Sequence, residues 1–176
     1  MAENAEVRLF EMTKQQDFVM HNLSAELGVK TSLYLVFAAF VLSASIQLLN
    51  FAKDLHVYLA RSAVFFCSLG AAITLLSGAA LLIAAFVRNY KIFPAKEIAD
   101  WLKSIEDYRR EYPQESVDDP ANGLLQTLIK TVDANQVVNE KKAKWIEIGA
   151  SLLFISLPFL AMGGAFAVCA YFSHPF

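Results

Sequence analysis

The sequence is poor in the residues that build catalytic, metal and redox sites. It has two cysteines, Cys67 and Cys169, and three histidines, which fall in separate regions of the chain. It contains no Gly-rich phosphate loop, no HExxH or GxSxG motif and no pair of carboxylates placed for acid–base work. These absences argue against an enzyme and a zinc site, so we assign no catalytic residue, metal ligand or cofactor. Two buried, inert thiols are the expectation for the cysteines.

Charge is also scarce. Charged residues make up 18% of the 176 residues and the formal net charge is −2, whereas soluble domains carry about 25% charged residues. Without a basic surface, direct binding of nucleic acid is not expected. Hydrophobic residues make up 56% of the chain and the mean hydropathy is +0.42. This composition indicates a membrane protein with several spans.

Three long apolar segments carry that hydropathy. Residues 62–87 contain no charged side chain and exceed the about 20 residues that a membrane-spanning helix needs. Residues 31–51 form a shorter and less apolar segment, and residues 145–172 form a third apolar segment with one charged side chain, Glu147. The predicted fold is therefore all-α, with three transmembrane helices and a cytosolic helical insert.

The domain organisation follows from these spans. We expect a cytosolic amphipathic helix over 1–30, a transmembrane hairpin over 31–88, a cytosolic insert over 89–144, and a third span with a short outer tail over 145–176. Apolar residues between Pro94 and Pro113 recur at helical spacing, which predicts a helix within the insert. From residue 124 to 148 the chain has no Gly or Pro, so we expect one helix to run from the insert through the last span.

Small residues in the second and third spans predict close helix packing. Gly70, Thr74 and Gly78 recur every four residues, which would place them on one helix face that another helix can approach closely. In the third span, Pro158 frees a backbone carbonyl and predicts a kink. Together with Gly163 and Gly164 it forms a candidate hinge, although such a kink can equally be a packing accommodation.

Polar side chains in the first span form a stripe. Ser43, Gln47 and Asn50 are spaced four and three residues apart, and Asp54 continues the series. A polar group in hydrocarbon needs a partner or water. Two interpretations remain open: the stripe bonds to other helices or reaches the interface, or it lines an aqueous pore.

Lysines and arginines predict the orientation. Lys141, Lys142 and Lys144 precede the third span, whereas the connector between the first two spans has only Lys53 and Arg61. The positive-inside rule then places the N-terminus and the insert in the cytosol and the C-terminus outside. The three lysines are also candidates for contact with an anionic ligand or lipid.

The layout resembles the small membrane effectors of bacterial anti-phage systems, namely the SLATT-like group and the transmembrane effectors paired with nucleotide-signalling enzymes. Residues 133–145, DANQVVNEKKAKW, carry the local resemblance, because asparagines there precede a basic run at the mouth of a span. SLATT-like proteins typically have two spans, so the third span is a departure. The resemblance implies a pore that permeabilises the inner membrane on a signal from a nucleotide or a nucleotide-producing partner protein.

These observations favour a homo-oligomeric membrane pore or ion channel of the inner membrane, with a cytosolic helical gate. At least four copies would be needed, since three spans of one chain cannot enclose a pore. The alternative from another class is a non-conducting membrane scaffold or accessory subunit that binds a cytosolic partner. A small membrane toxin, lethal without any signal, is a third hypothesis.

Overall fold

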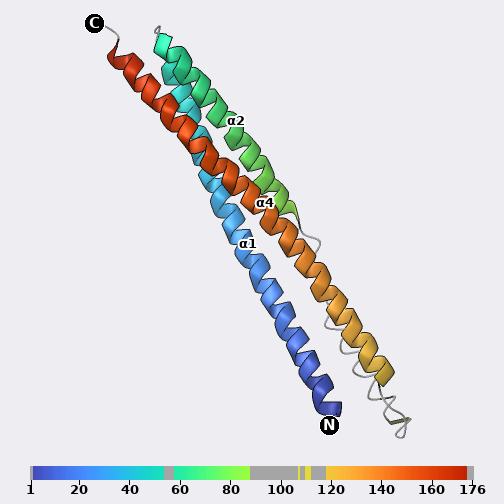
Figure 1. The fold of residues 1–176 in the computed structure, drawn as a ribbon. Coiled ribbons are helices and arrows are strands. Elements are labelled where there is room, and N and C mark those ends of the chain that lie inside the picture. The colour runs from blue at the N-terminus through green and yellow to red at the C-terminus, as the bar shows by residue number, and fades with distance from the viewer. Residues whose placement is uncertain (1, 54–57, 88–106, 108–109, 112–117, 174–176) are drawn as a thin grey trace. The chain divides into compact units, whose positions relative to one another are not determined.

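The computed structural model describes residues 2–53, 58–87, 107, 110–111 and 118–173. It has three long helices: α1 (Ala2–Lys53), α2 (Tyr58–Phe86) and α4 (Asp118–Phe172) (Figure 1). No strand occurs among the described residues, and the all-α prediction is confirmed.

Each of the three helices contains a segment that is long and apolar enough to cross a membrane. By length and composition, the candidate spans fall within Lys14–Lys53, Tyr58–Phe86 and Ile129–Phe172. The chain is therefore that of a multi-pass membrane protein. Both α1 and α4 are far longer than the about 20 residues that a span requires.

The structure joins segments that the sequence pattern treats separately. The predicted amphipathic segment and the first span belong to one continuous helix from Ala2 to Lys53, because this stretch has no proline and a single glycine, Gly28, which α1 tolerates. The predicted continuity into the last span is confirmed: α4 is one helix on both sides of Pro158. Of the helix predicted between Pro94 and Pro113, the structure describes only residues 107, 110 and 111, which are helical.

The chain divides into two compact units. We call Glu26–Val87 with Lys141–Phe176 the membrane unit, and Met1–Ala25 with Arg88–Glu140 the insert unit. In the membrane unit, α1, α2 and α4 lie side by side (Figure 1). One apolar cluster there joins Leu27 of α1, Ala84 of α2 and Ile146 of α4. A second cluster joins Ala52, Ala63 and Ala167, so each helix contributes to both.

Apart from Ala80 and Lys142, the buried residues of the membrane unit lie three, four or seven residues apart on their helices, and we call these positions the seam. This 3.5-residue average is the period of left-handed coiled coils. Most seam residues are small, which lets the helix backbones approach closely in an apolar surrounding. The seam comprises Leu27, Thr31, Ala38, Val41, Ser45 and Ala52 of α1; Ala60, Ala63, Cys67, Gly70, Thr74, Ser77, Leu81 and Ala84 of α2; and Ile146, Gly149, Leu153, Ser156, Leu160, Gly163, Ala167 and Ala170 of α4.

The insert unit buries polar side chains in place of small apolar ones. Asn135 and Asn139 of α4 are almost fully buried, and the amide of Asn139 donates a hydrogen bond of 3.2 Å to the backbone carbonyl of Met20 on α1. The same amide lies 3.7 Å from the Met20 sulfur. These contacts fix the pairing of α1 with α4 in this unit, because sliding either helix would leave a buried amide unsatisfied.

Candidate functional site

The polar stripe of α1 lies on the face of that helix opposite the seam. Ser43, Gln47 and Asn50 are all exposed. Each is two residues from a buried or partly buried seam-side position, and two residues turn a helix by about 200°. The stripe therefore points away from α2 and α4 of its own chain. Polar bonding between helices within one chain cannot account for it.

These exposed side chains differ from the buried polar ones in their hydrogen bonding. Within the seam, the hydroxyls of Thr31 and Ser45 each donate to a backbone carbonyl of their own helix at 2.7 Å. By contrast, neither Gln47 nor Asn50 makes a side-chain hydrogen bond to any residue that the structure describes. Burying such an amide in hydrocarbon without a partner costs about 2–7 kcal/mol. Water or a neighbouring chain must supply the partner.

The outward faces of α2 and α4 provide the contrast. Between Ser62 and Phe86, the exposed residues of α2 are apolar except Ser68. Between Ile148 and Cys169, the exposed residues of α4 are apolar except Ser151. A serine can satisfy its hydroxyl on its own helix, whereas a glutamine cannot do so as easily. Among the described apolar segments, α1 alone presents amides outward.

Three glycines mark where α2 and α4 approach most closely. A Cβ added at Gly70 would lie 2.9 Å from the Cγ of Leu160, and one added at Gly149 would lie 2.6 Å from the Cγ of Leu81. A Cβ added at Gly163 would contact the sulfur of Cys67 and lie 3.1 Å from its backbone nitrogen. At Gly70 and Gly149 a side chain would force the facing leucine to move, whereas at Gly163 it would also crowd the backbone of α2.

The other predicted packing and hinge residues differ in how closely they are packed. Thr74 is buried, and its hydroxyl donates to the carbonyl of Gly70 at 2.8 Å. Gly78 has no atom within 4 Å of an added Cβ, and Gly164 has only a Leu48 methyl at 4.0 Å. Pro158 is exposed on α4. The predicted set therefore divides into close contacts at Gly70 and Gly163 and open positions at Gly78 and Gly164.

One hydrogen bond links α2 and α4 across the seam. The hydroxyl of Ser77 donates to the backbone carbonyl of Gly149 at 2.6 Å. Both partners are buried in an apolar surrounding, where such a bond has no competition from water. The sequence did not predict this bond. The seven-residue spacing of Gly149, Ser156 and Gly163 indicates a packing face on α4, but it does not identify Ser77 of α2 as the partner.

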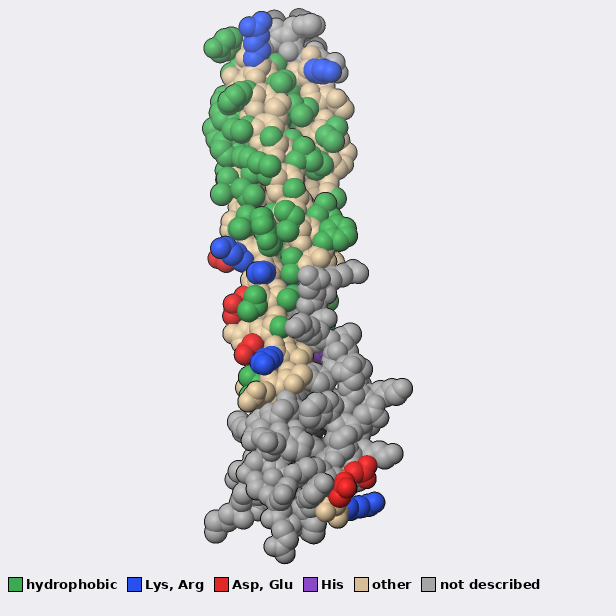
Figure 2. Space-filling model, turned by 90° about the vertical axis from the view of Figure 1, so that its right-hand side faces the viewer, with side chains coloured by type: hydrophobic (Ala, Val, Ile, Leu, Met, Phe, Trp, Pro, Cys, Tyr) green, Lys and Arg blue, Asp and Glu red, His purple; other side chains and the backbone are tan. Residues whose placement is uncertain are grey.

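The basic residues lie at both ends of the apolar band of the membrane unit (Figure 2). Lys53 and Arg61 adjoin the cluster around Ala52 and Ala63. The opposite end, around Ile146, holds the larger set, comprising Lys30, Lys141, Lys142 and Lys144.

The three lysines before the third span differ in exposure because they point in different directions from α4. Lys141 and Lys144 are exposed, whereas Lys142 is only 8% exposed. The Lys142 ammonium lies 3.8 Å from a Cβ added at Gly28 of α1. Adjacent residues on a helix point about 100° apart, so the three lysines cannot form one flat surface. The outward pair is the part available to an anionic ligand or lipid.

No protein-family model, characterised protein or solved structure matches this chain. Both cysteines are free thiols; Cys67 is buried as expected, but the expectation of a buried thiol was wrong for Cys169, which is exposed. The described residues contain no group of three His, Cys, Asp or Glu side chains that could hold a metal ion. The outward polar stripe of α1 is therefore the feature on which a function can be argued.

Proposed function

We propose that this protein assembles with copies of itself into a membrane pore lined by the outward face of α1. The observation that carries the proposal is the exposure of Gln47 and Asn50 in an apolar segment, with no hydrogen-bonding partner among the residues of their own chain that the structure describes. A ring of chains with α1 innermost gives both amides water. The apolar outward faces of α2 and α4 then face lipid.

The tight seam supports the assembly of several chains. Small residues close the space among the three helices of one chain, so an aqueous path has to lie between chains. At least four copies enclose such a path. In this proposal the end with more lysines faces the cytosol and the C-terminus lies outside, at a bacterial inner membrane. The resemblance to anti-phage effectors adds a signal-dependent role to the same pore.

Two measurements test the pore. The first is the mass of the particle in nanodiscs, where each chain contributes 19.5 kDa and four or more copies are expected. The second is labelling by a charged, membrane-impermeant thiol reagent of Gln47→Cys, in a background with Cys67→Ala and Cys169→Ala. Only a thiol in water ionises and reacts, so labelling of a wetted position should be about tenfold faster or more than that of a lipid-facing one.

Ser68→Cys in the same background is the matched control. Ser68 is exposed on α2. Ala52 of α1 and Ala63 of α2 share one apolar cluster, and Gln47 lies five residues from Ala52 just as Ser68 lies five residues from Ala63. The two positions therefore have similar depth. Equal labelling of both positions, or a monomeric or dimeric particle, would overturn the pore. A non-conducting scaffold would then be the better account.

A further inference from the structure

The outward face of α1 changes character halfway along its length. It begins with four large apolar side chains, and the polar stripe occupies only the second half. The four apolar residues and the three residues of the polar stripe each lie two residues from a buried or partly buried position of α1. The apolar half consists of Val29, Leu33, Val36 and Phe40, which are 62%, 67%, 71% and 69% exposed.

The apolar half is long enough to act as a barrier. From Val29 to Phe40 the helix rises by about 16 Å, roughly half of the about 30 Å hydrocarbon core of a bilayer. Ala38, two residues before Phe40, shares an apolar cluster with Val41, Leu153 and Leu160 in the membrane unit. Phe40 therefore lies well inside the span and away from the ends marked by lysines.

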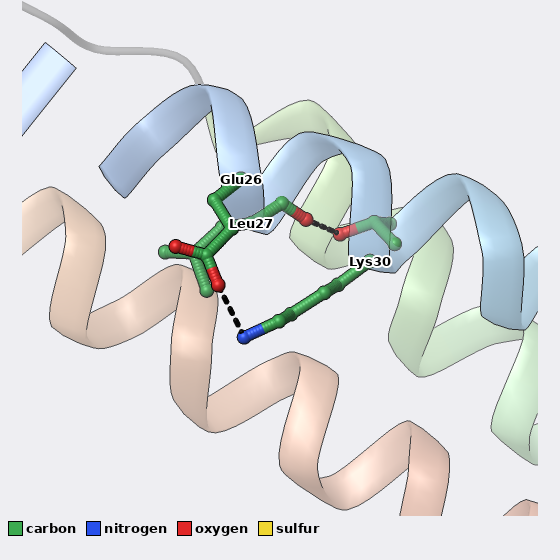
Figure 3. Close-up of polar contacts among 4 residues, drawn as sticks. Glu26, Leu27 and Lys30 are labelled. Atoms are coloured by element: carbon green, nitrogen blue, oxygen red, sulfur yellow. Dashed lines mark hydrogen bonds and ion pairs between the residues drawn. The ribbon is translucent and has the colours of Figure 1, made fainter. Parts of the chain in front are cut away.

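Charge at the mouth cannot serve as the barrier. Glu26 precedes Val29 on the same outward face, but its carboxylate is paired with the ammonium of Lys30 at 2.7 Å (Figure 3). Both side chains are exposed, and their charges cancel. Beyond this pair the outward face has no charged side chain before Lys53. One exposed polar side chain, Ser32, lies between Val29 and Leu33, and its hydroxyl donates to the carbonyl of Gly28 at 3.1 Å. Because that hydroxyl is satisfied on its own helix, ions would meet mainly apolar side chains before the polar stripe.

We propose that Val29, Leu33, Val36 and Phe40 form a hydrophobic gate in the assembled pore. This inference rests on the proposed pore function. Narrow channels with apolar walls expel water, and an ion that enters loses its hydration without gaining a ligand. In the assembly each of these residues repeats once per chain and so forms a ring around the pore. In the resting state the four rings keep the pore dry, while Ser43, Gln47 and Asn50 hold water on the other side. Opening requires these rings to widen or to become wet.

The experiment makes the gate polar without changing the seam. Phe40→Ser replaces the large apolar side chain nearest the polar stripe by a small polar one. Val36→Thr replaces a methyl group by a hydroxyl with almost no change of shape. Potassium efflux from liposomes is measured with no activator added. Phe40→Ser should raise the basal efflux about tenfold or more, equivalent to about 1.4 kcal/mol on the barrier. Val36→Thr should raise it in the same direction.

Phe154→Ser is the matched control. Phe154 is 59% exposed on α4 and follows Leu153, which shares the apolar cluster of Ala38. The control therefore places the same polar substitution at a similar depth on a lipid-facing surface. Its efflux should equal that of the wild type. All three variants keep the buried residues intact, and particle mass in nanodiscs verifies assembly.

Two failures can be told apart. If Phe40→Ser and Val36→Thr leak no more than Phe154→Ser, while Gln47→Cys still labels faster than Ser68→Cys in a ring of four or more copies, the gate is wrong and the pore remains. If the labelling contrast and the ring are absent as well, both proposals fall. A wild-type ring that already leaks as strongly as Phe40→Ser would also exclude the gate.

Discussion

Gly163→Leu is expected to force α2 and α4 apart and to lower the apparent melting temperature in detergent by about 6–12 °C. The new side chain would overlap the sulfur of Cys67 and crowd the backbone of α2, which a rotamer change cannot relieve. Overpacking of this kind costs up to about 3 kcal/mol, and each kcal/mol shifts the melting temperature of a chain of this size by about 2–4 °C. Thermal unfolding followed by circular dichroism measures the shift.

Gly78→Leu is the control for this substitution. Gly78 is also a helical glycine in a candidate span, but an added Cβ meets no atom within 4 Å. The same side chain should therefore fit at position 78, and the loss of a glycine should favour the helix by about 1 kcal/mol. Equal destabilisation by both substitutions would show that the close approach at Gly163 does not hold the helices together.

A double variant isolates the contact itself. Gly163→Ala adds only the Cβ whose nearest neighbour is the sulfur of Cys67. Cys67→Ala removes that sulfur, so it should recover part of the stability that Gly163→Ala loses. Residues in direct contact are expected to couple by about 0.5–3 kcal/mol. Strictly additive effects of the two substitutions would contradict the packing seen between α2 and α4.

The sequence predicted the helices better than their contact faces, and the reason is geometric. Gly70, Thr74 and Gly78 are spaced by four residues, and each step of four turns the helix by about 40° beyond a full turn. After two steps Gly78 lies about 80° from Gly70. Ser77, seven residues from Gly70, lies only about 20° away. The seam therefore continues through Ser77, which bonds to Gly149, and the open position at Gly78 follows.

Which way the polar stripe of α1 points could not be read from spacing alone. Two faces of this helix carry small or polar residues: Thr31 and Ser45 on one, Gln47 and Asn50 on the other. Either face could pack, since both satisfy the 3.5-residue period. The structure buries the face whose hydroxyls can bond their own backbone and leaves the amides outward. In the membrane unit the seam is closed mostly by small residues, so a side chain as long as that of Gln47 would fit there poorly.

Gln47→Leu is expected to reduce the activated conductance of the assembled pore by about tenfold, equivalent to about 1.4 kcal/mol on the barrier. The substitution would extend the apolar lining from Phe40 towards Asn50, with Ser43 as the only polar ring between them. Because Gln47 is exposed and makes no hydrogen bond within its described chain, insertion and folding should be unaffected. Single-channel recording on Phe40→Ser, with and without Gln47→Leu, measures the effect without an activator.

Gln47→Asn is the matched variant, since it keeps the amide and shortens the side chain by one methylene. It should retain most of the conductance if water and ions pass the amide. The two hypotheses for the chain separate here. In a pore, Gln47→Leu lowers conductance at constant particle mass. In a scaffold, where Gln47 bonds to a neighbouring helix, Gln47→Leu lowers particle mass or stability and no variant dissipates the membrane potential. Unchanged conductance with Gln47→Leu would remove α1 as the lining helix.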